Sequence, residues 1–282
     1  MIEQKYFRLS VIVIICISVL AGVLSHFQIS YQFYVWELFI DAKIIALLFL
    51  QLFLYKKKAV QFTNIKLLLL NWSWAKNIYY FFFPLFLYAV SIIAGILFKE
   101  VSLNKLDNAP TLILATVFDI PAIFVFSATS ILIEEIFFRG FILTTIQQLR
   151  SQWQTIILTN LLWVVFSISE IIGLEEISLL KFITVALFFL SIGILCTVLV
   201  GKYTSIWFGY SLRVGFVTLS PIIVTSLLSE SDVFFTTESF FFNAEGLIIS
   251  VLILTVGFIL LRTIRISPKI LEEKFVTAQR IF

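Results

Sequence analysis

Long apolar runs separated by short polar segments fill most of the chain. A helix that spans a membrane needs about 20 mostly apolar residues. By this criterion the pattern predicts eight spans, at residues 9–27, 34–55, 77–98, 121–148, 153–170, 179–200, 204–228 and 247–261. The segment 59–76 mixes Leu, Trp and Lys, which is typical of a segment that lies at the membrane interface. Glu37, Asp41 and Lys43 begin the second span, and we expect them to be boundary residues.

The composition supports this interpretation. The 282 residues are 61% hydrophobic and 13% charged, and the mean hydropathy is +1.07. Soluble domains are about 45–50% apolar and about 25% charged. A water-soluble globule of this length could not bury so much apolar surface. The fold class is therefore predicted to be all-α, a single polytopic membrane domain over residues 1–282 with membrane lipid as a partner. The net charge of +3 and the lack of a long basic run argue against a nucleic-acid partner.

The basic residues predict an orientation. With the N-terminus in the cytoplasm, fourteen of the twenty Lys and Arg residues fall on the inner side and three on the outer side. This asymmetry fits the positive-inside rule. An even number of spans then places both termini in the cytoplasm.

Five charged residues within the predicted spans are the candidate site: Glu134, Glu135, Arg139, Glu170 and Arg213. Charges in hydrocarbon are energetically unfavourable, so they tend to face the bundle interior and to be functional. A rise of 1.5 Å per residue places Glu135, Glu170 and Arg213 about 22, 26 and 16 Å from the inner surface. At these similar depths, we expect Arg213 to contact at least one of the glutamates. Glu135 and Arg139 share a helix face, whereas Glu134 points about 100° away, so the two glutamates are expected to differ in role.

The sequence from Glu134 to Gly140, EEIFFRG, resembles the E-E-x-x-x-R-G signature of the CPBP family. This family of intramembrane proteases includes the type II CAAX prenyl endopeptidases and the bacteriocin-processing and immunity proteins. The resemblance implies a membrane bundle with an endopeptidase core, and the eight predicted spans suit the family.

Two further stretches align in order, so that the resemblance covers a core of about 121–217. Phe166 to Glu170 lies where the family has F-x-x-x-H, and Glu170 stands at the histidine. Arg213 stands at the histidine of the third motif, H-x-x-x-N, and Val217 at its final position.

These departures bear on the chemistry that the resemblance implies. In the family, the first-motif glutamates and the two histidines hold a metal or activate a water. Here both imidazoles are absent, and the only histidine, His26, is not placed by any motif. Carboxylates alone suit a zinc site poorly, and Arg213 would repel a cation. We therefore expect no metal and no cofactor, and favour a buried ion pair between Glu170 and Arg213.

The function predicted from these observations is that of a degenerate protease acting as a regulator, scaffold or chaperone of a membrane-protein partner. One alternative is an active intramembrane endopeptidase for a peptide substrate, with Glu134 or Glu135 as the base and Arg139 or Arg213 holding the oxyanion. Another is a small transporter or lipid-binding protein that uses the carboxylates as a proton or cation path. A further alternative is that the charged residues form a purely structural cluster of ion pairs, which holds the helices together.

Overall fold

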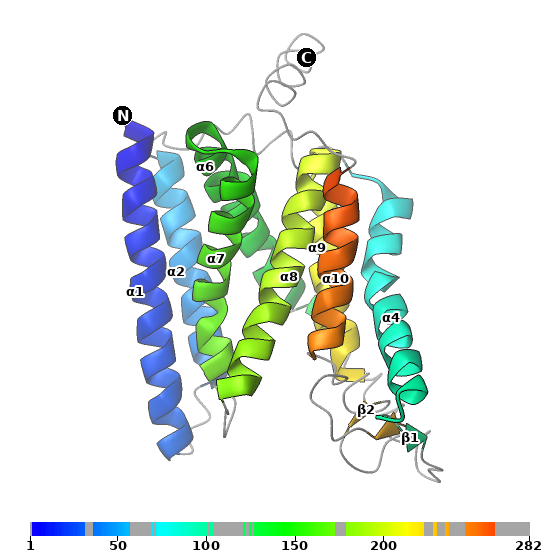
Figure 1. The fold of residues 1–282 in the computed structure, drawn as a ribbon. Helices are drawn as coiled ribbons and strands as arrows, with labels where there is room; N and C mark the ends of the chain where they lie inside the picture. Colours follow the sequence, from blue (N-terminus) through cyan, green and yellow to red (C-terminus); the bar gives the residue numbers. More distant parts are fainter. Residues whose placement is uncertain are drawn as a thin grey trace.

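A computed structural model of the chain was analysed. The structure describes residues 2–31, 36–56, 69, 72–100, 102–103, 121, 124–125, 127–172, 179–222, 228–229, 235–236 and 246–262. Within these ranges helices dominate, and they lie side by side in one bundle (Figure 1).

The long helices are α1 (Ile2–Tyr31), α2 (Trp36–Lys56), α4 (Trp74–Leu97), α7 (Gln152–Ile172), α8 (Leu179–Tyr203), α9 (Trp207–Ile222) and α10 (Leu247–Arg262). Between α4 and α7, residues 127–135 are α-helical and continue into the π-helix η1 (Ile136–Ile142) and then into α6 (Leu143–Leu149). We call the continuous helix over residues 127–149 the motif helix.

A small sheet joins the segments at one end of the bundle. Its strands are β1 (Ser102–Leu103), β2 (Leu228–Ser229) and β3 (Phe235–Thr236), in the order β1-β3-β2. The β1–β3 pair is antiparallel and the β2–β3 pair is parallel. The sheet lies at the end opposite to the N-terminus (Figure 1). The three strands have only two residues each, and the other elements are helices. The prediction of a helical fold class is therefore confirmed.

Every predicted apolar run overlaps a helical segment of the structure. The seventh predicted run extends to Leu228, but Leu228 lies in β2, so that run is not helical to its end; α9 is described over Trp207–Ile222. Among the described residues, the helices Trp74–Leu97 and Phe182–Tyr203 are long and apolar enough to cross a membrane, and Tyr6–Ala21 and Leu247–Arg262 are shorter apolar helices. The number of spans therefore stays a prediction. Most of the predicted interfacial segment 59–76 lies outside the described residues.

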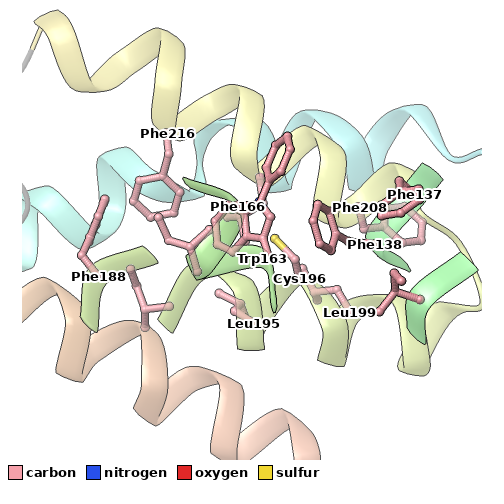
Figure 2. Close-up of a cluster of buried hydrophobic side chains, with 14 of the residues drawn as sticks. Phe137, Phe138, Trp163, Phe166, Phe188, Leu195, Cys196, Leu199, Phe208 and Phe216 are labelled. Atoms are coloured by element: carbon pink, nitrogen blue, oxygen red, sulfur yellow. The ribbon is translucent and has the colours of Figure 1, made fainter. Parts of the chain in front are cut away.

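Aromatic side chains form much of the bundle core. Trp163 and Phe166 of α7 and Phe137 and Phe138 of η1 are buried in one hydrophobic cluster that also includes Phe188, Phe208 and Phe216 (Figure 2). Phe138 packs on Phe166 with ring centroids 5.5 Å apart. This core holds the motif helix against α7, α8 and α9.

The crossing of α4 and α9 depends on a glycine. A Cβ atom added at Gly215 of α9 would collide with the backbone carbonyl of Phe81 in α4. Small residues permit such close approaches between membrane helices. Since backbone atoms cannot rotate away, a side chain here would have to push the two helices apart.

We expect Gly215→Ala to lower the free energy of unfolding by about 1–3 kcal/mol, the usual range for overpacking. The matched control is Gly257→Ala in α10, where an added Cβ would meet its nearest neighbour at 3.9 Å. There the better helix propensity of alanine should leave stability unchanged or raise it. Unfolding of the purified protein in detergent measures both, and equal stability of the two variants would contradict the close crossing.

Candidate functional site

Four of the five predicted site residues meet inside the bundle. Glu134 and Glu135 end the α-helical part of the motif helix, Arg139 lies in η1, and Arg213 lies in α9. Their relative exposures are 5%, 0%, 0% and 7%. Charges removed from solvent to this degree are tolerated only when they are paired and hydrogen-bonded.

The first motif coincides with a change of helix type. From Ile136 to Ile142 the chain is π-helical, and the Leu143 N–H donates to the carbonyl of Phe138, five residues earlier. π-helical turns are rare and are often found at functional sites. Arg139 and Gly140 are both buried within this wider turn. The Arg139 Nη1 atom lies 3.4 Å from Glu135 Oε1, as their four-residue spacing suggested.

Arg213 bridges the two glutamates. Its Nη2 donates to Glu134 Oε2 at 2.7 Å, and its Nη1 donates to Glu135 Oε1 at 2.9 Å. The expectation that Arg213 contacts a glutamate is confirmed. The two carboxylates converge on one guanidinium because its two nitrogens point along different directions and can serve acceptors on adjacent helical positions.

Trp163 of α7 supports this bridge, and the sequence analysis missed it. Its Nε1 donates to Glu134 Oε2 at 2.9 Å. The guanidinium carbons of Arg213 and Arg139 lie 4.5 and 5.0 Å from the centroid of its ring, within the range of cation–π attraction. One signal was available, because Trp163 lies two helical turns before Glu170 and thus on the same side of α7.

Arg139 reaches towards α7 and α8. Its Nη2 donates to Asn160 Oδ1 at 3.3 Å and to the carbonyl of Gly193 at 3.4 Å. The Asn160 amide nitrogen also donates to Thr197 Oγ1 at 3.1 Å. A Cβ at Gly193 would lie 2.6 Å from Asn160 Oδ1 and 2.7 Å from the Trp163 ring, so glycine is needed for this packing.

Lys43 of α2 belongs to the same region, and the expectation that it is a boundary residue is wrong. Its side chain is 3% exposed, donates to the carbonyl of Phe166 at 3.1 Å and lies 4.4 Å from the Phe166 ring centroid. The sequence could not reveal this, because the partner atom is a backbone carbonyl that any residue carries.

The remaining candidates are placed less fully. Glu170 lies in α7 one turn beyond Phe166, but its side chain lies outside the described residues, as does that of His26 in α1. The Glu170–Arg213 ion pair therefore stays a prediction, while the observed ion-pair partners of Arg213 come from the first motif. Val217 is 41% exposed and offers no polar side-chain atom.

The buried charges of the described residues are two carboxylates, two guanidiniums and one ammonium. Within the described part of the chain, no three His, Cys, Asp or Glu side chains gather as metal ligands would. Glu135 Oε2 and Arg139 Nε are buried and have no hydrogen-bond partner there. Both glutamates are thus held by cations, and one edge of the Glu135–Arg139 pair retains unused hydrogen-bonding capacity.

The region that contains this cluster matches a known protein family. Residues 115–219 match the family described as Type II CAAX prenyl endopeptidase Rce1-like. The matched region contains all five candidate site residues and covers a little over a third of the chain. The resemblance of this core to the CPBP family is therefore confirmed, and the family that it matches is membrane-embedded. No curated protein matches the chain.

We expect Arg213→Gln to lower the free energy of unfolding by about 3–5 kcal/mol, because it leaves two buried carboxylates without their shared cation. Unfolding in detergent, followed by circular dichroism, measures the change. Arg262→Gln at the exposed end of α10 is the matched control and should stay within about 0.5 kcal/mol of the wild type.

Adding Glu134→Gln to the Arg213→Gln variant should recover part of the loss, because one uncompensated charge is removed. Additive losses in the double variant would contradict a direct coupling between the two side chains.

Proposed function

We propose that this protein is a degenerate CPBP protease that binds a membrane-protein partner as a regulator, scaffold or chaperone and does not cleave it. The observation that carries the proposal is the Arg213 bridge to Glu134 and Glu135. It joins the residues that would activate a water in the family to a residue that stands at a family histidine.

A general base needs a free lone pair directed at the water that it activates. Glu134 Oε2 already accepts from Arg213 and from Trp163, and Glu135 Oε1 accepts from Arg213 and pairs with Arg139. These contacts favour a carboxylate that is held in place. They support a structural role for the motif glutamates.

The same guanidinium disfavours a metal. Two like unit charges 4 Å apart repel by about 4 kcal/mol at an effective dielectric constant of 20, and a divalent cation doubles this value. Arg213 lies within 3 Å of both glutamates and would compete with any cation for them. We therefore propose that the site works without metal or cofactor.

The cluster joins helices that are distant in sequence. Arg213 links α9 to the motif helix, Trp163 and Asn160 link α7 to it, and Lys43 links α2 to α7. A core tied in this way suits a fixed binding partner for another membrane protein better than a site that must open to admit a peptide.

We also propose a multi-pass arrangement with eight spans and both termini in the cytoplasm. In support, basic residues of six helices gather at the end of the bundle that holds the N-terminus (Figure 1). They are Arg8 of α1, Lys56 of α2, Lys76 of α4, Arg150 after α6, Lys202 of α8 and Arg262 of α10.

One observation favours the active endopeptidase as a second candidate. Glu135 Oε2 and Arg139 Nε are buried and unpartnered within the described residues, and such atoms commonly bind ordered water in proteins. Glu135 would then be the base, and Arg139 would stabilise the oxyanion. The transport alternative is not proposed, because Glu134 and Glu135 are ion-paired.

We expect Glu134→Gln to keep the cellular function. Membrane proteomes of cells that lack the protein, or carry the wild type, Glu134→Gln or the exposed-site control Glu100→Gln, test this. The partner's abundance should fall without the protein and return with all three forms, since a scaffold needs no base.

The competing outcome is a set of new peptide termini that appears with the wild type and with Glu100→Gln and is lost with Glu134→Gln. Cleavage of the same sequence by the purified wild-type protein in vesicles would then establish a protease. The amount of each variant in the membrane serves as the folding control.

A further inference from the structure

A second group of aromatic residues, which shares no side chain with the charge cluster, lies where the start of α4 meets the end of α8 and the start of α9 (Figure 1). We call it the interfacial cluster. Two chains of ring contacts form it: Trp74–Trp72–Trp207–Tyr210, with centroids 5.1, 4.7 and 5.6 Å apart, and Tyr79–Tyr80–Tyr203–Phe208, with centroids 5.2, 6.2 and 4.8 Å apart.

Two lysines converge on one ring of this cluster. The Lys76 Nζ atom lies 4.7 Å from the centroid of Tyr203, and the Lys202 Nζ atom lies 5.6 Å from the same centroid. Among the described residues, neither lysine forms an ion pair. Both ammonium groups lie beside the same ring, and an anion bound at this ring would be attracted by both charges.

The Tyr203 ring is fixed in place. Its hydroxyl bonds to that of Tyr80 at 3.1 Å. Directly after it, Thr204 adopts a left-handed conformation with φ of 51° and turns the chain towards α9. Residues other than glycine seldom adopt this backbone conformation, and β-branched residues adopt it least often. The α8–α9 turn therefore fixes Lys202 and the Tyr203 ring, and Lys76 reaches the same ring from α4.

The exposed rings indicate the depth of this cluster in the membrane. Trp74 and Tyr79 are 72% and 60% exposed. Exposed Trp and Tyr rings are enriched at the level of lipid headgroups, where an apolar body contacts acyl chains and a polar edge contacts water. The cluster also lies at the end of the bundle where the basic residues gather (Figure 1). Lysines at this depth face headgroup phosphates.

From this juxtaposition we propose that Lys76 and Lys202 bind the phosphate of one anionic phospholipid, whose acyl chain packs on Trp74 and Tyr79. Anionic headgroups suit the site because a zwitterionic lipid brings its own cation beside the lysine pair. This binding site is separate from the Glu134–Arg213 cluster and does not depend on its function.

Native mass spectrometry of the full-length protein in detergent tests the proposal. Dioleoyl-phosphatidylglycerol and dioleoyl-phosphatidylcholine are titrated in parallel, and the dissociation constant of the first bound lipid is compared. A lysine near a membrane surface contributes about fivefold in affinity for an anionic lipid. Each single substitution, Lys76→Gln or Lys202→Gln, should therefore weaken phosphatidylglycerol binding about fivefold, and the double variant about 25-fold, with phosphatidylcholine binding unchanged.

The matched control is Lys56→Gln with Arg262→Gln, which removes the same charge from the same end of the bundle and should change binding less than twofold. Lys76→Arg with Lys202→Arg should retain the preference, which guards against loss of fold. Inorganic phosphate at the lipid concentration should not compete, since it lacks the acyl chains. Equal affinity of the wild type for the two lipids, or an equal loss in the control pair, would overturn the proposal.

Discussion

A guanidinium buried among apolar helices must be paired, and the arrangement of this bundle follows from how Arg213 meets that requirement. It donates to Glu134 and Glu135 at 2.7 and 2.9 Å, and all three side chains are nearly inaccessible to solvent. In a medium of low dielectric constant, leaving any one of them alone would be costly. The depth and rotation of α9 relative to the motif helix are therefore tightly constrained.

The rest of the site extends from this bridge. Trp163 supplies a hydrogen-bond donor to Glu134 and a ring against both guanidiniums, and Gly193 leaves room for it. Arg139 pairs with Glu135 and reaches α8 through the Gly193 carbonyl. This network lies within residues 115–219, the region that matches the type II CAAX prenyl endopeptidase family. Under the proposed function, the fold of this region is retained and its role has changed.

Much of the candidate site could be predicted from the sequence, because charged residues are rare in apolar runs. Glu134, Glu135, Arg139 and Arg213 are conspicuous there, and the rise per residue places them at similar depths. The rotation of each helix about its axis could not be predicted. For that reason the sequence favours a pair between Glu170 and Arg213, whereas the described ion pairs of Arg213 are with the glutamates of the first motif.

Other features of the site gave a weak sequence signal or none. Trp163 contributes its indole nitrogen, and Lys43 contributes a hydrogen bond to a backbone carbonyl. Contacts of both kinds are common in ordinary packing, so the sequence does not single them out. The π-helix depends on tertiary packing and has no sequence pattern of its own. The helices themselves were predictable, since apolar runs of this length have few other solutions in lipid, where backbone groups must be satisfied internally. The strand at Leu228, within the seventh predicted run, and the other two-residue strands were not.

The central claim is that Arg213 holds both motif glutamates as paired carboxylates. Infrared spectroscopy of the protein in lipid, with carbon-13 placed in its glutamates and with Glu134→Gln and Glu135→Gln to assign the bands, tests it most directly. The account predicts that both side chains absorb as ionised carboxylates in the wild type and that at least one absorbs as a protonated carboxyl in Arg213→Gln. A protonated band from Glu134 or Glu135 in the wild type, or identical bands in Arg213→Gln, would contradict it.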